Sequence, residues 1–217
     1  IAAFSITFLF TSCKKEDCPN PVVPTEKTLT LQPGSSNGKD AFVAFSAGSP
    51  ASNDLNLGNE KTLDTYTWTN GGSLVQSRTF ISFPLDSIPA GAEIVSAKLS
   101  IYGVASSIFT PQGNSGDNKL YIQRVLQNWS EETITWNNQP STTSEFQIAT
   151  LASTSQWNYD LNDIDVSNQV KQMRSTGNNF GFCLRLITEQ TYRSIVLGAS
   201  EADNSAKRPK LTVVYKN

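Results

Sequence analysis

The chain has 217 residues, with 17 Lys and Arg against 19 Asp and Glu, which gives a net charge of −2 at pH 7. This balance disfavours nucleic-acid binding, because no surplus of cations is available to neutralise phosphates. The sequence contains no histidine, which excludes catalytic triads and general bases built on histidine and most zinc sites.

Residues 1–13 predict a lipoprotein signal. Ile1–Phe10 is an apolar run too short to span a bilayer and typical of the hydrophobic part of a signal peptide, whose basic beginning we expect to precede it. Thr11 and Ser12 place small side chains before Cys13, which resembles a lipobox whose cysteine accepts a diacylglycerol. The alternative is an ordinary cleaved signal in which the cysteine occurs by chance.

Residues 14–27 predict a tether. Lys14–Asp17 (KKED) resembles the charged signal that sends lipoproteins of some Gram-negative bacteria to the outer leaflet. Pro19–Thr25 contains three prolines, which favour an extended and semi-rigid spacer. We therefore expect an outer-membrane lipoprotein of the bacterial cell envelope that is surface-exposed and held to the membrane by its acyl chains.

Residues 28–217 predict one all-β domain. Short apolar or alternating runs are separated by Gly, Asn, Asp, Ser and Pro, and the alternation is clearest in Lys210–Tyr215. The expected strands are Thr28–Gln32, Ala41–Ser46, Arg78–Leu85, Ala97–Tyr102, Lys119–Leu126, Thr133–Trp136, Phe180–Ile187, Ser194–Gly198 and Leu211–Tyr215. This pattern favours an antiparallel two-sheet β-sandwich of the jelly-roll type, without the βαβ alternation of an α/β fold.

One short helix is predicted over residues 165–177. Ser167 is expected to cap its start, and Gly177 suits its end. The apolar face consists of Val166, Val170 and Met173. We expect this helix to close one end of the sandwich.

Four groups of segments, in order along the chain, match one family pattern. They are Arg78–Asp86 with Ile88–Ala92 and Ser96–Leu99, then Trp129–Pro140, then Asp165–Ser167 with Asn179–Phe182, and finally Arg208–Tyr215. Over about Ala41 to Tyr215 the chain therefore resembles the DNRLRE domain, which is related to the carbohydrate-binding modules of family 96. The resemblance implies a β-sandwich of secreted and surface proteins, often found beside polysaccharide lyases or other glycan-active domains. It also implies non-catalytic binding of polysaccharides, including acidic ones such as alginate.

Several of the matching side chains are expected to stabilise the fold. Trp129, Trp136, Phe83 and Tyr215 have apolar neighbours, which favours core packing over ligand stacking. Cys183 lies inside an apolar strand and is expected to be a small core residue. Ion pairs are expected at the rim of the sandwich between Arg78, Arg124 or Arg208 and Glu131, Glu132 or Asp86.

Neighbouring Glu131 and Glu132 do not predict an acid/base pair. On a strand the two side chains face opposite ways, and no second positioned carboxylate is expected nearby. Asp and Asn are frequent in the expected loops, at Asp40, Asn53–Asp54, Asp64, Asn114–Asn118 and Asn158–Asp165. Solvated turns are the expectation there, and a structural Ca²⁺ is the alternative, since the ordered spacing of a Ca²⁺ loop is missing. No other cofactor is expected.

Aromatic residues in loops are the candidate carbohydrate-binding residues. Sugar rings stack their apolar C–H faces on aromatic rings, while their hydroxyls and carboxylates bond to Arg, Lys, Asn and Gln. The candidates are Tyr66 and Trp68 beside Gly71 and Gly72 with Lys61 upstream, Trp157 and Tyr159, and Tyr192 with Arg193. Each is alternatively a packed loop residue, and we expect at least one of the three loops to contact ligand.

The sequence therefore predicts a surface lipoprotein that binds polysaccharide without catalysis, with a glycan-degrading enzyme as a candidate partner. The alternative is a structural or adhesive spacer of the cell envelope, in which the aromatic loops are buried and no groove exists. A small polysaccharide lyase using Tyr192 as acid and Arg193 as carboxylate neutraliser is disfavoured, because histidine and a clear carboxylate cluster are missing.

Overall fold

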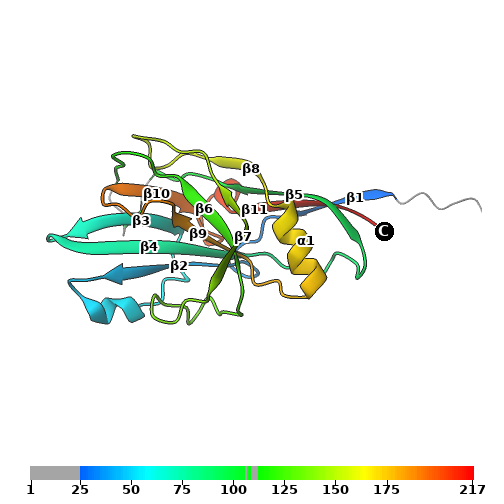
Figure 1. Cartoon of the computed structure of the whole chain (residues 1–217), viewed down its shortest axis with the longest axis horizontal. Helices are drawn as coiled ribbons and strands as arrows, with labels where there is room; N and C mark the ends of the chain where they lie inside the picture. The colour runs from blue at the N-terminus through cyan, green and yellow to red at the C-terminus, as the bar shows by residue number, and fades with distance from the viewer. Residues whose placement is uncertain (1–24, 106, 109–111) are drawn as a thin grey trace, which may run out of the picture.

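The computed structural model describes residues 25–105, 107–108 and 112–217. The predicted signal, Cys13 and most of the tether lie outside this part of the chain. Within it, the strands form two antiparallel sheets and there is one α-helix, which confirms the predicted all-β sandwich (Figure 1).

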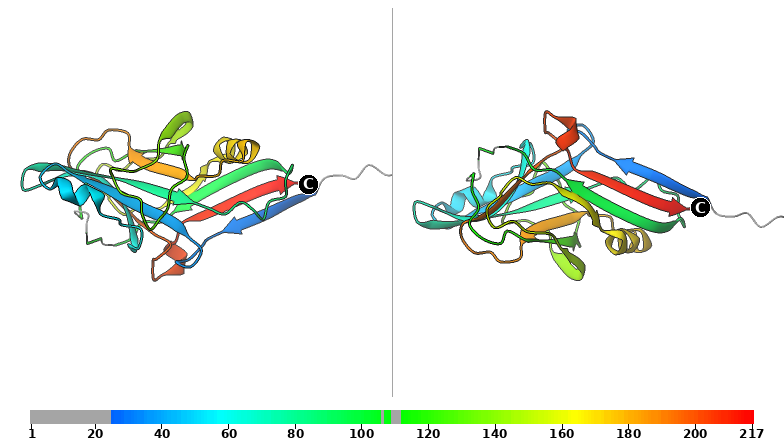
Figure 2. Two further views of the ribbon diagram at one scale, coloured as in Figure 1. Left: turned by 90° about the horizontal axis from the view of Figure 1, so that it is seen from below. Right: turned by 90° about the horizontal axis from the view of Figure 1, so that it is seen from above.

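The chain orders its elements so that sequence neighbours often belong to different sheets. They are β1 (Glu26–Leu31), β2 (Lys39–Ser46), η1 (Pro50–Asp54), β3 (Thr62–Asn70), β4 (Ser73–Ser82), β5 (Glu93–Ile101), β6 (Leu120–Val125), β7 (Thr142–Ala149), β8 (Leu161–Asp165), α1 (Ser167–Thr176), β9 (Phe182–Leu186), β10 (Arg193–Gly198), η2 (Ser205–Lys207) and β11 (Lys210–Lys216). The smaller sheet has the order β1-β11-β5-β8. The larger has the order β10-β3-β4-β9-β6-β7, with β2 also paired to β4. Figure 2 shows β1, β11 and β5 side by side in one layer.

The expected strand over Thr133–Trp136 is wrong, because these residues form turns between β6 and β7. Asn138 provides the physical reason: its side-chain oxygen accepts a hydrogen bond from Thr135 N at 2.7 Å, and its amide donates to Thr133 O. Such local bonds satisfy the backbone in place of a strand ladder. All the other expected runs overlap strands, whereas β3, β7 and β8 were not predicted.

The main core lies between the two sheets and is built by alternation. Leu99 and Ile101 of β5 and Leu211 of β11 face Ile122 of β6 and Leu184 of β9, and all five are at most 1% exposed. Phe83 is buried in this core and Tyr215 packs against it, as expected. Packing of the two sheets against each other thus removes the apolar face of each sheet from water.

A second apolar cluster lies on the other face of the larger sheet. Phe80 of β4 and Cys183 of β9 are direct cross-strand partners there. The segment between β6 and β7 covers them with Trp129 and Ile134, and Trp136 packs at the edge of the cluster. The predicted core roles of Trp129, Trp136 and Cys183 are confirmed.

Helix α1 completes the main core with Val170 and Met173, and Val166 precedes it. Ser167 does not cap the helix, because its hydroxyl accepts from Ala97 N at 2.9 Å on β5 and donates to Asp165 at 2.5 Å. The helix ends as predicted at Gly177, whose φ of 70° is left-handed. Figure 1 places α1 toward the end of the molecule where the C-terminus lies.

The two ends of the described chain meet at one end of the sandwich. Strands β1 and β11 pair antiparallel, with Glu26 opposite Lys216 and an ion pair between their side chains at 3.3 Å. The β3–β4 hairpin extends at the opposite end (Figure 1). In the described part of the chain, the helices lack the combination of length and hydropathy that crossing a bilayer requires.

Candidate functional site

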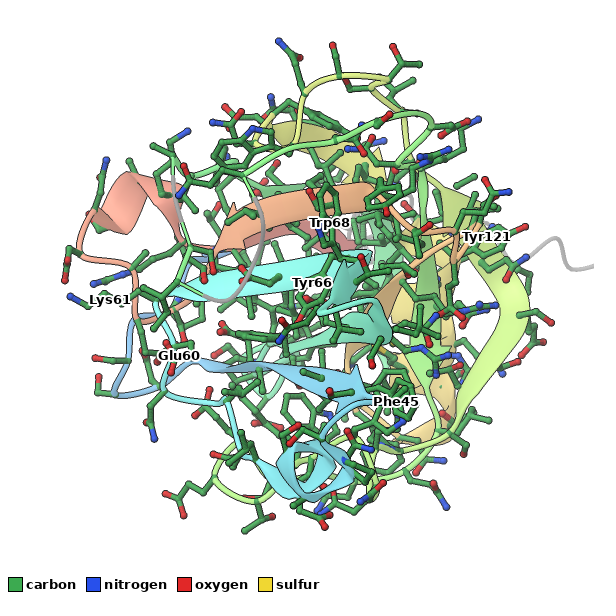
Figure 3. The ribbon with its side chains drawn as sticks, turned by 90° about the vertical axis from the view of Figure 1, so that its left-hand side faces the viewer. Phe45, Glu60, Lys61, Tyr66, Trp68 and Tyr121 are labelled. Atoms are coloured by element: carbon green, nitrogen blue, oxygen red, sulfur yellow. The ribbon has the colours of Figure 1, made fainter. Side chains whose placement is uncertain are left out.

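A groove of about 490 Å³ lies near the hairpin end, between η1 and strands β2 and β3. It is lined by Ala44, Phe45, Ser46, Ser49, Ser52, Leu55, Leu57, Tyr66, Trp68, Thr69, Asn70 and Val75. We call it the aromatic groove. Figure 3 looks onto this end of the molecule and labels Phe45, Tyr66 and Trp68. Since these lining residues include no Lys, Arg, Asp or Glu, the groove suits uncharged ligand surfaces.

The β3–β4 hairpin positions the aromatic side chains. Gly71 and Gly72 have φ values of 56° and 82°, which a two-residue hairpin turn of type I′ requires and glycine adopts without strain. This turn sets the register that places Trp68 opposite Val75. Tyr66 and Trp68 are therefore strand residues, where the sequence predicted a loop.

Trp68 forms an aromatic pair with Tyr192, the residue before β10. Their ring centroids are 5.0 Å apart at an interplanar angle of 88°, the edge-to-face arrangement that aromatic pairs favour. Tyr192 is 47% exposed and holds a left-handed φ of 67°. The structure thus brings together two of the three predicted aromatic segments.

Tyr66 supplies a hydroxyl to the same groove. Its side chain is 6% exposed, and burial, with a smaller contribution from Asp64, raises the pKa of Tyr66 to about 12. The phenol is therefore neutral at physiological pH. Within the described residues, neither this hydroxyl nor the indole N–H of Trp68 forms a hydrogen bond.

The third predicted segment does not reach the aromatic groove. Tyr159 packs against the main core, and its hydroxyl donates to Asn118 Oδ1 at 2.9 Å. Trp157 is half-buried, and its carbonyl accepts a hydrogen bond from Val196 N at 2.7 Å. These residues hold the segment before β8 against the sandwich. Tyr159 is therefore packed in the fold, whereas Trp157 is joined to the sandwich by its backbone.

Arg193 has a positioning role beside the aromatic groove. Its guanidinium donates to the carbonyls of Ser115 and Thr191, the latter at 3.3 Å, and fills the space next to Gly116. An arginine bound in this way to backbone carbonyls is not free to neutralise a substrate carboxylate. Lys61, the upstream cation, instead forms an exposed ion pair with Asp203 at 2.8 Å.

A second groove, of about 610 Å³, lies on the face of the larger sheet away from the main core. We call it the polar groove. Its lining comprises Arg78, Gln123, Gln127, Gln139, Pro140, Ser141, Thr142, Ser144, Cys183 and Arg185. Sequence reasoning missed Gln123 and Arg185, although the alternation in Phe182–Leu186 (FCLRL) indicates that Cys183 and Arg185 share a face opposite the apolar residues.

The expected arginine pairs form with different partners. Arg78 pairs with Glu189 at 3.1 Å and Arg124 with Glu145 at 2.8 Å. Arg208 donates instead to the carbonyl of Ala202 at 3.1 Å. Glu145 on β7 and Glu189 before β10 are brought to these arginines by the order of the strands in the sheet, which the local sequence does not reveal.

Three carboxylates gather beside β2, which corrects the expectation that Glu131 lacks such neighbours. Oxygens of Asp40, Glu131 and Glu201 lie within 4.8 Å of one another, and Glu131 lies in a turn. Asp40 N donates to Glu131 Oε1 at 2.7 Å, and Ser200 N donates to Asp40 Oδ2 at 3.0 Å. Among the described residues these are the ones whose carboxylates could together hold a metal ion of the oxygen-preferring kind.

Burial favours the protonated form of Asp40 more than in an ordinary aspartate. The side chain is 2% exposed, and burial, followed by the charge of Glu201, raises its pKa well above the usual range. The pKa of Glu131 is also raised, chiefly by burial. These groups do not line either groove, so the carboxylate cluster is a separate feature.

Comparison with known proteins gives one family. No curated protein matches the chain. Residues 32–215 match carbohydrate-binding module family 96, and this range includes every residue that lines the two grooves. The chain therefore belongs to carbohydrate-binding module family 96.

Proposed function

We propose that the chain binds a polysaccharide, without catalysis, in the aromatic groove. The observation that carries this proposal is the convergence of Tyr66, Trp68 and the adjoining Tyr192 on an open groove without charged lining residues. Membership of family 96 supports carbohydrate binding in general. The groove also favours binding over the spacer alternative, which predicts that no groove exists.

The chemistry of the groove suits a sugar ring. The face of an aromatic ring takes the apolar C–H face of a pyranose, and Trp68 is fixed for this role by its edge-to-face contact with Tyr192. The neutral hydroxyl of Tyr66 and the side chains of Thr69 and Asn70 can bond to sugar hydroxyls. Because the lining holds no titratable group that is ionised near neutral pH, it offers no general base, which supports the non-catalytic assignment.

Display at the cell surface is part of the proposal. The predicted anchor at Cys13 precedes β1, and β1 starts at the end of the sandwich opposite the β3–β4 hairpin (Figure 1). A tether at that end would direct the aromatic groove away from the membrane. A polymer held there would be presented to a glycan-degrading enzyme, the partner class that the sequence predicts.

Affinity gel electrophoresis with neutral and acidic polysaccharides tests the proposal. We expect retardation by at least one polymer and about tenfold weaker binding in Trp68→Ala, because loss of about 1.4 kcal/mol of stacking corresponds to a factor of ten. Trp157→Ala is the matched control, since Trp157 lies outside the aromatic groove. Equal retardation of both variants, or no retardation of the wild type by any polymer, would count against the proposal.

A further inference from the structure

The polar groove contains a cation that forms no ion pair with the carboxylates of the described residues. Arg185 of β9 is half-buried and lies between β4 and β6 in the larger sheet. Its Nε donates to Gln123 Oε1 at 3.2 Å, and its guanidinium lies over the ring of Tyr121 at 5.5 Å. Within the described residues it has no carboxylate partner, and its two terminal nitrogens donate no hydrogen bond.

Neighbouring Arg78 shows the contrast. Its Nε and Nη2 both donate to Glu189, and its Nη1 donates to Gln139 at 3.2 Å. The same guanidinium lies over the Trp136 ring at 4.9 Å. The charge of Arg78 is therefore balanced by Glu189, and its guanidinium nitrogens have hydrogen-bond acceptors. The net positive charge of the polar groove then comes from Arg185.

The position of Arg185 is fixed by a buried amide. Gln123 is 5% exposed, and its Oε1 accepts from Thr142 Oγ1 at 2.9 Å as well as from Arg185. Its Nε2 donates to Gln147 Oε1 at 2.8 Å. These bonds, with the Tyr121 ring beneath, hold the guanidinium in one orientation before any ligand arrives. Preorganisation of this kind lowers the entropy that binding must overcome.

We propose that Arg185 is the centre of a second subsite, which takes an oxyanion substituent of a sugar, either a carboxylate or a sulfate ester. Two terminal nitrogens of one guanidinium bind such a group in a bidentate manner. Gln127 and Ser144 line the same groove, and the Gln127 amide and the Ser144 hydroxyl offer neutral donors to the rest of the sugar. The inference rests on the proposed function, because it takes the oxyanion to be carried by a polysaccharide.

The test compares charged polymers with uncharged polymers of the same backbone. Polygalacturonate is paired with its fully methyl-esterified form, and a sulfated galactan with the unsulfated galactan. Arg185→Met is compared with Lys171→Met, which removes the same charge from an exposed position on α1. We expect Arg185→Met to bind at least one charged polymer roughly fivefold more weakly, with unchanged binding of its uncharged counterpart. Lys171→Met should bind like the wild type.

Arg185→Lys tests whether geometry matters in addition to charge, because lysine keeps the positive charge and cannot bind an oxyanion in a bidentate manner. Binding weaker than wild type in this variant supports the subsite. The carboxylate and sulfate pairs show which oxyanion is bound. Thermal unfolding of each variant confirms that the fold is intact.

The two proposals fail in different ways. Equal binding of the charged polymers by wild type and Arg185→Met overturns the oxyanion subsite and leaves the aromatic groove standing. Loss of binding in Arg185→Met together with no effect of Trp68→Ala supports the subsite and overturns the assignment of the aromatic groove. No binding of any of the four polymers by the wild type overturns the subsite.

Discussion

Asp40 shows how burial decides the behaviour of a single carboxyl group. It lies at the start of β2, almost completely buried, with Glu131 and Glu201 near its oxygens. One neighbour that donates to it, Ser200 N, favours the ionised form, but burial and the charge of Glu201 outweigh that bond. Ionisation of Asp40 therefore places negative charge in a buried position beside Glu201, which destabilises the folded state.

The pH dependence of stability follows from this shift. A carboxyl whose pKa is raised on folding contributes most stability below its unfolded pKa of about 4. That contribution is lost as pH rises through the folded pKa of Asp40. We expect the wild type to lose unfolding free energy as pH increases above about 4, as measured by urea unfolding over a pH series.

Asp40→Asn tests the origin of that dependence. The amide cannot ionise, and its oxygen can still accept from Ser200 N. We expect this variant to be more stable than the wild type at pH 7 and to lose less stability as pH rises. The melting temperature is also measured in millimolar Ca²⁺. If Ca²⁺ raises it in the wild type and not in Asp40→Asn, this explanation is contradicted, and a bound cation balances the charge of the cluster.

At the scale of elements, the segment between β6 and β7 acts as a cover for the larger sheet. Trp129 is 7% exposed, lies 5.9 Å from the Phe80 ring between centroids, and donates from Nε1 to Phe180 O at 2.8 Å. Lys39 lies over the same indole at 4.5 Å. One side chain thus contacts β2, β4 and the segment that precedes β9.

Two substitutions separate the packing of Trp129 from its hydrogen bond. Trp129→Ala should lower the unfolding free energy by about 3–5 kcal/mol, the cost of removing a large buried aromatic group. Trp129→Phe keeps a ring and loses the bond to Phe180 O, so we expect a loss of about 1–3 kcal/mol. Denaturant unfolding measures both. Similar losses in the two variants would mean that the hydrogen bond, and not packing, dominates.

For the whole molecule, alternation and turn residues were enough to predict the sandwich and most of its strands. The β3–β4 hairpin was not predicted, although Asn70-Gly71-Gly72 is a hairpin signal that favours strands on both sides. Strand β3 was missed because Tyr66 and Trp68 were interpreted as loop residues. Strand β7 is largely exposed and polar, so it lacks the apolar period that identifies a strand.

The candidate sites were predictable only in part, for a reason of topology. Tyr66 and Trp68 could be chosen from composition, but their contact with Tyr192 depends on β3 pairing with β10 across more than a hundred residues of sequence. The polar groove depends on β4, β9 and β6 lying side by side. Long-range strand order decides which side chains meet, and a local pattern does not contain it.

The Trp136 ring contacts one lining residue of each groove. Trp136 lies 5.5 Å from the ring of Phe45, which lines the aromatic groove, and 4.9 Å from the guanidinium of Arg78, which lines the polar groove. The two grooves are therefore neighbours on one rigid body. A polymer long enough to occupy both would gain its second contact as an intramolecular step.

We therefore expect affinity to rise steeply with the length of a charged oligosaccharide, once it is long enough to reach from one groove to the other. Isothermal titration with a length series measures this. Trp68→Ala and Arg185→Met should each abolish the steep rise while leaving weak binding of short oligomers to the intact groove. An affinity that increases gradually with length in the wild type, and equally in both variants, would mean that the grooves bind separate chains.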